Sequence, residues 1–423
     1  MSDTKDSKTR SRGSRPLNIA VGIALVGALL FLIWTAARGG IASVLTESAV
    51  KANSLADADA AIRFGPGDPN AHFVRANLLE ANNNLPSAII EYQKSVALRP
   101  DDYVLWLSLS RAFELNGQNT EAIEAGRKAV TLAPYYADPR WFLGNLLIRH
   151  GHQDEGWTEL SRAGESNPAL LPAIINLAWR LSKEDAQFVI RAVKPQRPES
   201  YLALAQFFRK HDQFEPAISM YQAAGRTADQ ERQLYVAELI KKKDYQKAYL
   251  LWSNKSPDIQ AVGAIIDGGF EQENNLDGVG FGWRSASRQG VNLSLDPNRP
   301  HGGQASLRVD FDGNSDPGTP LISQLVLIEP DTRYQLRIAA RAEEIVSGGL
   351  PVVLVIDGNS GEVLGKASEI SQISAWREYT IDFTTHAATT ALQFSLQRNP
   401  CTSAPCPIYG RLWLDDFSLQ KSQ

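Results

Sequence analysis

The chain has 423 residues, of which 43% are hydrophobic and 21% charged, and its net charge is −4. A single hydrophobic core rarely exceeds about 250–300 residues, so this length predicts two or three domains. The composition is that of a globular protein and excludes collagen-like and disordered chains. Residues 1–16 carry a net charge of +3, which leaves −7 on the other residues. Such an acidic body lacks the basic patch typical of nucleic-acid-binding proteins, so no nucleic-acid partner is expected.

Residues 17–37 form an uncharged apolar stretch directly after this basic tail. As a helix that rises about 1.5 Å per residue, these 21 residues reach roughly 30 Å, the thickness of the hydrocarbon core of a bilayer. Trp34 lies near the end of the stretch, where aromatic residues favour the membrane interface. The pattern predicts one transmembrane helix over 17–37, with the tail 1–16 in the cytoplasm by the positive-inside rule.

A cleaved signal peptide is the alternative interpretation of the same stretch. Signal peptides have an apolar region of about 7–15 residues followed by a small-x-small cleavage site. The stretch 17–37 is longer, and neither a convincing cleavage motif nor a cysteine for lipidation follows it, so the anchor is preferred. Both interpretations place the rest of the chain outside the cytoplasm. In a double-membraned bacterium, the anchor predicts a single-pass inner-membrane protein with a periplasmic body.

Residues of the same type return every 34 positions in the next part of the chain. Pro100, Pro134 and Pro168 have this spacing, and so do Gly117 and Gly151. A period of this length indicates helix–turn–helix units that stack as a solenoid. Since no unit can bury its own apolar face, the units pack on one another and leave a long surface for protein or peptide segments.

The units resemble the tetratricopeptide repeat family in their aromatic, leucine, glycine, alanine and proline positions. The resemblance extends over residues 41–258, about half of the chain, with a looser register after Pro168, and implies about six units that bind a protein partner. It rests on Ala76, Leu79, Ala88, Tyr92 and Pro100 in the first clear unit, on Trp106, Leu109, Phe113, Gly117, Ala122, Ala129 and Pro134 in the second, and on Leu143, Gly144, Leu147, Gly151, Leu160, Ala163 and Pro168 in the third.

Protein-binding residues are expected on the exposed faces of the first helices of these units. The candidates are Asn77, Arg111 and Asn145. Asn77 and Asn145 occupy the same repeat position two units apart, one that often faces the groove in the resembled family. A solvated polar face without a partner is the alternative for each. The aromatic and alanine positions recur at helical spacing and are predicted to form the core.

Residues 259–420 change from a helical period to alternation. Apolar and polar side chains alternate in 305–311, 334–340, 379–383 and 392–396. Strands of this kind between clusters of Gly, Pro, Asn and Asp indicate an antiparallel sandwich. The predicted fold class is therefore multidomain α + β, with a transmembrane helix, an all-α solenoid and a C-terminal antiparallel β-sandwich of eight to ten strands.

Several segments of this domain resemble the carbohydrate-binding jelly-roll modules attached to many glycoside hydrolases. The resemblance implies a jelly roll and suggests a glycan ligand, although a fold alone does not transfer function. The segments are Asp267–Glu271, Gly282–Trp283, Gly302–Gly303, Pro330 and Tyr334, and Leu414–Leu419.

Three tryptophans are the candidate glycan-binding residues, because a sugar site needs an exposed ring that stacks on the CH face of a pyranose. Trp283 and Trp376 are more readily explained as packing residues, as in the resembled modules. Trp413 alternates with Leu412 and Leu414 and is therefore expected to point to the surface.

Three carboxylates are candidate ligands of a structural calcium ion, the one cofactor weighed for this chain. Related modules often hold Ca²⁺ with carboxylate and backbone oxygens where the first and last strands meet. Glu271, Asp415 and Asp416 are expected near that place, although a dense Asp-x-Asp loop is missing.

Cys401 and Cys406 are the two cysteines of the chain. A pair this close in an exported protein predicts a local disulfide. A zinc site would need two more ligands, and no histidine is nearby.

No catalytic motif stands out, since the chain has no Gly-x-Ser-x-Gly elbow, Walker loop or His-Glu-x-x-His sequence. We expect a non-catalytic, membrane-anchored scaffold. Its solenoid would bind a partner protein and its sandwich a glycan or another subunit, in the assembly or export of envelope polysaccharide. A protein–protein adaptor with the sandwich as a structural cap is the alternative, and a glycan-active enzyme is the third possibility.

Overall fold

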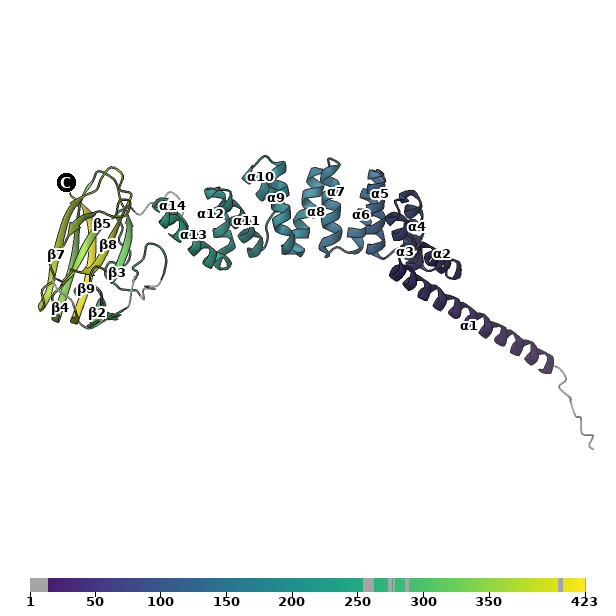
Figure 1. Cartoon of the computed structure of the whole chain (residues 1–423), viewed down its shortest axis with the longest axis horizontal. Helices are drawn as coiled ribbons and strands as arrows, with labels where there is room; N and C mark the ends of the chain where they lie inside the picture. The colour runs from purple at the N-terminus through teal and green to yellow at the C-terminus, as the bar shows by residue number, and fades with distance from the viewer. Residues whose placement is uncertain are drawn as a thin grey trace, which may run out of the picture. The chain divides into compact units, whose positions relative to one another are not determined.

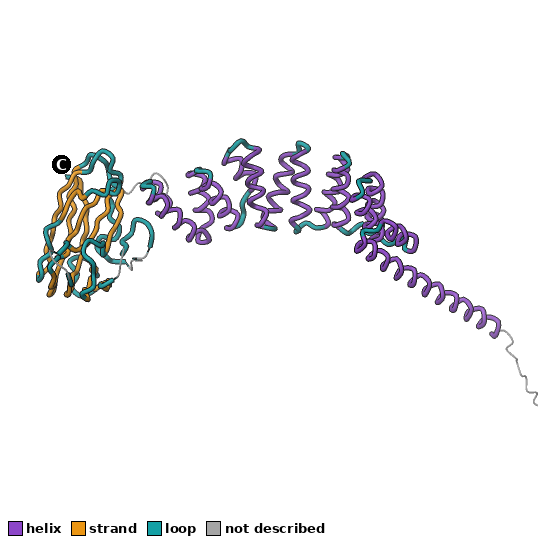
Figure 2. Tube along the Cα trace, in the orientation of Figure 1, coloured by secondary structure: helices purple, strands orange, loops and turns teal. Residues whose placement is uncertain are grey.

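The computed structural model describes residues 14–253, 262–272, 276, 278–285, 289–401 and 406–422, with side chains from residue 22 onward. Within these ranges all helices precede all strands (Figure 2). The chain divides into two compact units, residues 1–203 and 204–423. The boundary between the units falls within helix α11 (Pro198–Lys210).

Consecutive helices of the first unit form antiparallel pairs (Figure 1). The first helices of three pairs begin one repeat period apart, at residues 69, 103 and 137, and so do the second helices, at residues 85, 119 and 153. The period of the sequence is thus the period of the structure. The helices are α1 (Ser14–Ala52), α2 (Leu55–Phe64), α3 (Pro69–Ala81), α4 (Leu85–Leu98), α5 (Tyr103–Leu115), α6 (Asn119–Leu132), α7 (Ala137–Arg149), α8 (Gln153–Ser166), α9 (Leu171–Leu181) and α10 (Ala186–Val193), with a 3-10 turn η1 (Pro168–Leu170) before α9.

The recurring small residues serve the turns and the close contacts between helices. Gly117 and Gly151 have φ values of 78° and 86° in the turns after α5 and α7, and Asn83 has φ 60° at the same position after α3. Glycine and asparagine accept this left-handed conformation more readily than other residues. At Gly144, a Cβ atom would lie only 2.7 Å from Cγ of Leu160, so glycine permits the close packing of α7 on α8.

Helix α1 begins as an exposed apolar segment and ends as part of the helical repeats. Ile23 is 70% exposed and Trp34 54% exposed, whereas Ala42 and Ala49 are buried against the following helices. Among the described residues, 22–52 is the one helical stretch long and apolar enough to cross a membrane. A membrane anchor and a signal sequence both fit these features.

The second unit contains the remaining helices, α12 (Phe214–Ala224), η2 (Gly225–Ala228), α13 (Asp229–Lys241) and α14 (Tyr245–Ser253). The described residues contain fourteen α-helices, or seven helix pairs counted in chain order, against the six or so units expected. Helix α14 packs directly on the sandwich. The hydroxyl of Tyr245 donates to the carbonyl of Gly358 at 2.6 Å, and the rings of Tyr249 and Phe281 lie 5.0 Å apart.

The strands form two antiparallel sheets, which confirms the predicted sandwich. One sheet has the strand order β1-β2-β9-β4-β7 and the other β3-β8-β5-β6. The strands are β1 (Val291–Asp296), β2 (Ser306–Asp312), β3 (Ile322–Leu327), β4 (Arg333–Ser347), β5 (Pro351–Asp357), β6 (Val363–Lys366), β7 (Ser374–Thr384), β8 (Ala391–Arg398) and β9 (Ile408–Lys421).

The alternation in the sequence matches the face that each strand turns to the core. Leu307 and Val309 of β2, Leu336 of β4 and Phe394 of β8 are all buried in one cluster between the sheets. The polar residues between them on β2 face outward. The predicted disulfide between Cys401 and Cys406 is present, between the end of β8 and the start of β9.

Candidate functional site

A polar cavity of about 590 Å³ opens between the first helices α3 and α5, above the second helix α4. We call it the repeat pocket. It contains two of the three residues predicted to bind a partner, Asn77 and Arg111, which are one repeat period apart and both exposed. The repeat pocket is lined by Asn77, Glu80, Ala81, Asn83, Leu85, Tyr92, Ser108, Arg111 and Leu115.

Tyr92 of α4 forms the floor of the repeat pocket and holds two of its polar residues in place. Its hydroxyl lies 2.5 Å from Oδ1 of Asn77 and 2.7 Å from Oε2 of Glu80. One phenol hydrogen can be donated to one of these oxygens at a time. Burial raises the pKa of Tyr92, and the Glu80 carboxylate raises it further, so the hydroxyl stays protonated and works as a donor.

Arg111 brings a positive charge into the pocket, which the carboxylate of Glu80 also lines. Its guanidinium lies over the ring of Phe142, 5.4 Å from the centroid. In the part of the chain that the structure describes, Arg111 forms no ion pair, whereas the nearby Glu114 is paired with Arg149 at 2.5 Å. Arg111 is therefore free to bind an anionic group from outside.

Asn145, the third predicted residue, has the equivalent position on α7 but does not line the pocket. Its Nδ2 donates to the carbonyl of Trp141 at 2.7 Å, within its own helix. The pocket residues Tyr92 and Glu80 were not among the predicted binding residues. The repeat position of Tyr92 predicts a core residue, and it is indeed buried although it also lines the pocket.

A second, more apolar cavity of about 580 Å³ lies between α4 and α6. Trp106 and Phe113 of α5 line it, together with Lys128 of α6. Phe113 is buried as predicted, whereas Trp106 is only half-buried. Trp106 nevertheless packs against the core of the repeats, as its repeat position predicts, with part of its ring left uncovered.

The sandwich has a cavity of about 750 Å³ on the outer face of its five-stranded sheet. We call it the sheet pocket. Tyr409 of β9 is 52% exposed there and is the aromatic residue of the pocket that faces solvent. Its charged residues partly pair with one another, as Arg308 does with Asp310 at 2.7 Å. The lining residues are Arg308, Asp310, Phe311, Glu343, Glu344, Ile345, Val346, Gln372, Ile373, Tyr409, Gly410 and Arg411.

Trp413 is buried, so the expectation of an exposed ring is wrong. Its side chain does point away from the core, as alternation predicts, but it is only 4% exposed. The guanidinium groups of Arg341 and Arg308 lie 4.6 and 5.7 Å from its ring centroid. Its Nε1 donates to the Asp296 carboxylate at 2.8 Å. Two cations and a carboxylate thus cover the ring that a sugar would need.

The other two tryptophans differ from each other. Trp283 is 3% exposed and lies between Phe270 and Phe417, with ring centroids 5.1 and 4.7 Å away, so it is a core residue and unavailable to a glycan. Trp376 of β7 is half-buried, and its Nε1 donates to the carbonyl of Arg299 at 2.9 Å. Of the three, Trp376 alone keeps ring surface accessible to solvent.

The three predicted calcium ligands approach the same loop, but they do not form a cation cage. Asp415 accepts hydrogen bonds from the backbone of His301 and Gly302, at 2.9 and 3.1 Å, and burial raises its pKa. Asp416 lies 2.6 Å from Nδ1 of His301. Glu271 accepts from the backbone N–H of residue 304. No three carboxylate, histidine or cysteine side chains of the described residues share a metal-sized site, so side chains alone do not form a calcium site here.

The family comparison finds tetratricopeptide repeats in the first unit. A model of the family described as tetratricopeptide repeat matches residues 48–103 and 92–137. These ranges contain α3, α5 and the whole of the repeat pocket. No protein with a curated description matches the chain.

Several solved structures are similar to parts of the chain at low identity. PilF of Pseudomonas aeruginosa is 15% identical, over 48% of this chain and 99% of its own, with a TM-score of 0.34. YrrB, described as a TPR protein with an unusual peptide-binding site, is 20% identical over 40% of this chain and 92% of its own, with a TM-score of 0.29. A structure described as CBM4 is 14% identical over 38% of this chain and 100% of its own, with a TM-score of 0.28.

Proposed function

We propose, because this chain contains tetratricopeptide repeats, that it is a non-catalytic scaffold whose repeat pocket binds an extended segment of a partner protein. The segment carries a carboxylate, from a side chain or a chain end, that pairs with Arg111. Helix α1 anchors the scaffold in the inner membrane of a bacterium, with residues 1–16 in the cytoplasm and the rest in the periplasm. The disulfide between Cys401 and Cys406 supports an extracytoplasmic location, since such bonds persist in oxidising compartments.

The observation that carries this proposal is that Asn77 and Arg111, from two successive repeats, line the same cavity. An amide offers a donor and an acceptor to the backbone of a bound segment, and a guanidinium offers a fork of donors to a carboxylate. Leu85 and Leu115 add apolar surface at the rim, and Leu115 is 62% exposed. A peptide can thus satisfy its backbone, one charge and one apolar side chain in the same cavity.

Affinity capture from solubilised membranes tests the repeat pocket. The full-length chain is compared with Arg111→Glu and with a matched control, Arg191→Glu, which reverses the charge of an exposed arginine on α10. We expect a protein that co-purifies with the wild type and with Arg191→Glu and is lost from Arg111→Glu. Equal recovery with both variants would contradict the proposal.

A glycan ligand for the sandwich is the second candidate function, supported by the sheet pocket and its exposed Tyr409. The ring of Tyr409 offers a face for a sugar, and the surrounding arginine and carboxylate groups offer donors and acceptors to hydroxyl groups. Together with the membrane anchor, this supports a role in the assembly or export of envelope polysaccharide. The alternative is an adaptor for proteins alone, in which the sandwich is a cap.

Retention on immobilised bacterial polysaccharides separates these two functions. We expect the full-length chain to be retained and Tyr409→Ala to elute early. Tyr135→Ala is the matched control, because Tyr135 is 86% exposed and lies in the helical repeats. No retention of the wild type on any polysaccharide would favour the adaptor. New reducing ends released from a retained polysaccharide would instead favour an enzyme.

A further inference from the structure

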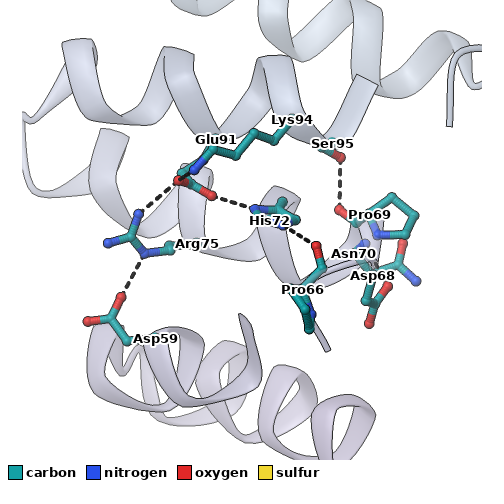
Figure 3. A network of polar contacts seen from close by, with 10 residues as sticks. All are labelled: Asp59, Pro66, Asp68, Pro69, Asn70, His72, Arg75, Glu91, Lys94 and Ser95. Carbon is teal, nitrogen blue, oxygen red and sulfur yellow. Dashed lines mark hydrogen bonds and ion pairs between the residues drawn. The ribbon is translucent and has the colours of Figure 1, made fainter. Parts of the chain in front are cut away.

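His72 is buried between α3 and α4 with both ring nitrogens facing hydrogen-bond acceptors (Figure 3). Nδ1 lies 2.5 Å from Oε2 of Glu91, and Nε2 lies 3.0 Å from the carbonyl oxygen of Pro66. The histidine is 4% exposed and the glutamate 3%, so solvent does not replace either partner. A carbonyl oxygen has no hydrogen to donate. The Nε2 atom must therefore carry one, and the hydrogen between Nδ1 and Glu91 must come from one of those two groups.

The Glu91 carboxylate is held in its ionised form. Its Oε1 atom lies 2.9 Å from Nζ of Lys94 and 3.1 Å from Nη1 of Arg75 (Figure 3). Burial acts to raise the pKa of Glu91, but its hydrogen bonds to His72 and Lys94 outweigh burial, so the pKa lies below its usual range. An ionised carboxylate cannot donate to Nδ1. Opposite an ionised Glu91, the two contacts of the ring are both satisfied by the form with hydrogen on both nitrogens, the imidazolium.

The equivalent position two repeats later holds a residue that is charged at every pH. Arg140, two repeat periods after His72, donates to the carbonyl of Pro134 from Nε and Nη2, at 2.8 and 2.7 Å. Its Nη1 pairs with Glu159, which likewise lies two repeat periods after Glu91. The same proline carbonyl and the same glutamate are therefore used in both repeats, with histidine in one and arginine in the other.

The repeat between them shows what the position requires. Trp106, one repeat period after His72, donates its single N–H to the carbonyl of Pro100 at 2.8 Å. The position of the glutamate is occupied by Ala125, which is buried. In these three repeats, an acid is thus present only where the residue on the first helix has a second N–H to donate. Among the three residues, histidine alone can lose that second hydrogen near neutral pH.

We propose that protonation of His72 is a pH-sensitive lock on the α3–α4 helix pair. At mildly acidic pH the imidazolium donates to both Pro66 and Glu91 and joins the two helices. As the pH rises the ring loses one hydrogen, and either the carbonyl or the carboxylate then faces a nitrogen lone pair in a buried site. The contact between α3 and α4 is therefore most stable at mildly acidic pH and weakens toward alkaline pH. The contact between α7 and α8, which Arg140 makes, does not change with pH in this range.

The other charged groups around His72 do not replace the lost hydrogen. Arg75 is already paired with Asp59 of α2, at 2.6 Å, as well as with Glu91. Asp68, in the turn before α3, accepts from the backbone of residue 70. On α1, Arg38 donates to backbone carbonyls of α2 and not to the histidine. Lys94 binds the far oxygen of Glu91.

The lock has a consequence for partner binding that rests on the proposed function. Asn77, Glu80 and Tyr92 lie on α3 and α4. The stability of the contact between these two helices therefore determines whether the side chains of the repeat pocket keep their positions. Acidification is then expected to favour capture of the partner. The lock itself is measured without any partner, so its failure is distinguishable from failure of the proposed function.

Hydrogen exchange of the full-length chain in detergent, at about pH 5.5 and about pH 8, tests the lock on either side of the usual histidine titration. After correction for the intrinsic pH dependence, we expect amides of α3 and α4 to exchange on the order of tenfold faster at the higher pH. His72→Arg should remove this difference. Arg140→His, the matched variant, should create a similar difference in α7 and α8.

Equal protection of α3 and α4 at the two pH values in the wild type would overturn the lock. So would a pH difference that persists in His72→Arg. If His72→Arg does not fold, Glu91→Gln serves instead. The glutamine amide donates to a neutral ring as readily as its oxygen accepts from a charged one, so the difference should again shrink. Its survival in Glu91→Gln would be equally decisive against the lock.

Discussion

The helical repeats and the sandwich differ in how well the sequence predicts the solvent exposure of a side chain. In the repeats, the face that a residue occupies follows from its position in the repeat unit, and Asn77 and Arg111 indeed come together in one pocket. In the sandwich, alternation predicts which face of the sheet a side chain points to. It does not predict whether neighbouring side chains bury it there. Trp413 points outward from β9 as expected and is nevertheless buried by Arg308, Arg341 and Asp296. Solvent exposure is therefore more predictable on a solenoid than on the outer face of a sheet.

Buried charge also differs between the two regions. The repeats bury ion pairs between the two helices of a unit, as Arg140 does with Glu159. The sandwich buries Arg398 against neutral partners, since this guanidinium is fully buried and donates to the carbonyl of Cys406 at 2.8 Å. It also buries Trp413 beneath charged groups at its outer face. Four substitutions test the comparison between the helical repeats and the sandwich. They are given in order of the expected loss in free energy of unfolding, from the largest to the smallest.

Trp413→Ala is expected to have the largest effect, although it faces away from the core. Loss of a buried tryptophan costs about 3–5 kcal/mol in free energy of unfolding. It also leaves the Asp296 carboxylate without its N–H donor. Urea denaturation followed by the β-sheet signal of the full-length chain measures the change. A cost below about 1 kcal/mol, typical of a surface site, would show that the ring is not part of the fold.

Glu159→Ala removes one partner of the buried pair in the repeats and should cost roughly 3 kcal/mol, because Arg140 is left as an uncompensated buried charge. The matched control is Glu155→Ala on the same helix, where Glu155 pairs with Arg127 at 2.7 Å and its side chain is 41% exposed. That exposed pair should contribute less than about 1 kcal/mol. Denaturation of the helical signal compares the two. Equal costs would contradict the distinction between the buried and the exposed pair.

Replacement of Cys401 by serine opens the loop that the disulfide closes. For a loop as short as this one, the lost constraint on the unfolded chain is expected to cost about 2 kcal/mol. Differential scanning calorimetry should show a lower melting temperature for the sandwich and no change for the helical repeats. A shift of the helical transition alone would be inconsistent with a local bond.

Arg111→Ala should have the smallest effect on stability and the largest on partner capture. An exposed side chain without an ion pair contributes less than about 0.5 kcal/mol. Thermal unfolding and affinity capture on the same preparation test both parts. A variant that unfolds early would assign Arg111 a structural role in place of a binding role.

The sequence predicted most of the fold, because both periods are imposed by packing. The repeat of Pro100, Pro134 and Pro168 placed the helix pairs, and the alternation in 305–311 placed a strand with its apolar residues inward. The cysteine pair was also predicted. These features are local in sequence, so a single chain is enough to find them.

The sites were less predictable because they depend on contacts between distant residues. Tyr409 lies next to Gly410 in no recognisable motif, and only the packing of three strands reveals the sheet pocket around it. The carboxylates predicted as calcium ligands lie around one loop, as expected. Backbone N–H groups, however, donate hydrogen bonds to the oxygens of Asp415 and Glu271. The His72 contact did leave a signal, since Glu91 and Glu159 are two full repeat periods apart.

The most direct test of partner binding is site-specific photo-crosslinking in intact cells, with the photoreactive residue at Leu115 in the repeat pocket or at Lys128 in the cavity on the other side of α5. We expect a discrete protein adduct from position 115, its loss when Arg111→Glu is added, and none of it from position 128. The same adduct from both positions, or an adduct at 115 that survives Arg111→Glu, would show that the partner does not bind in the repeat pocket.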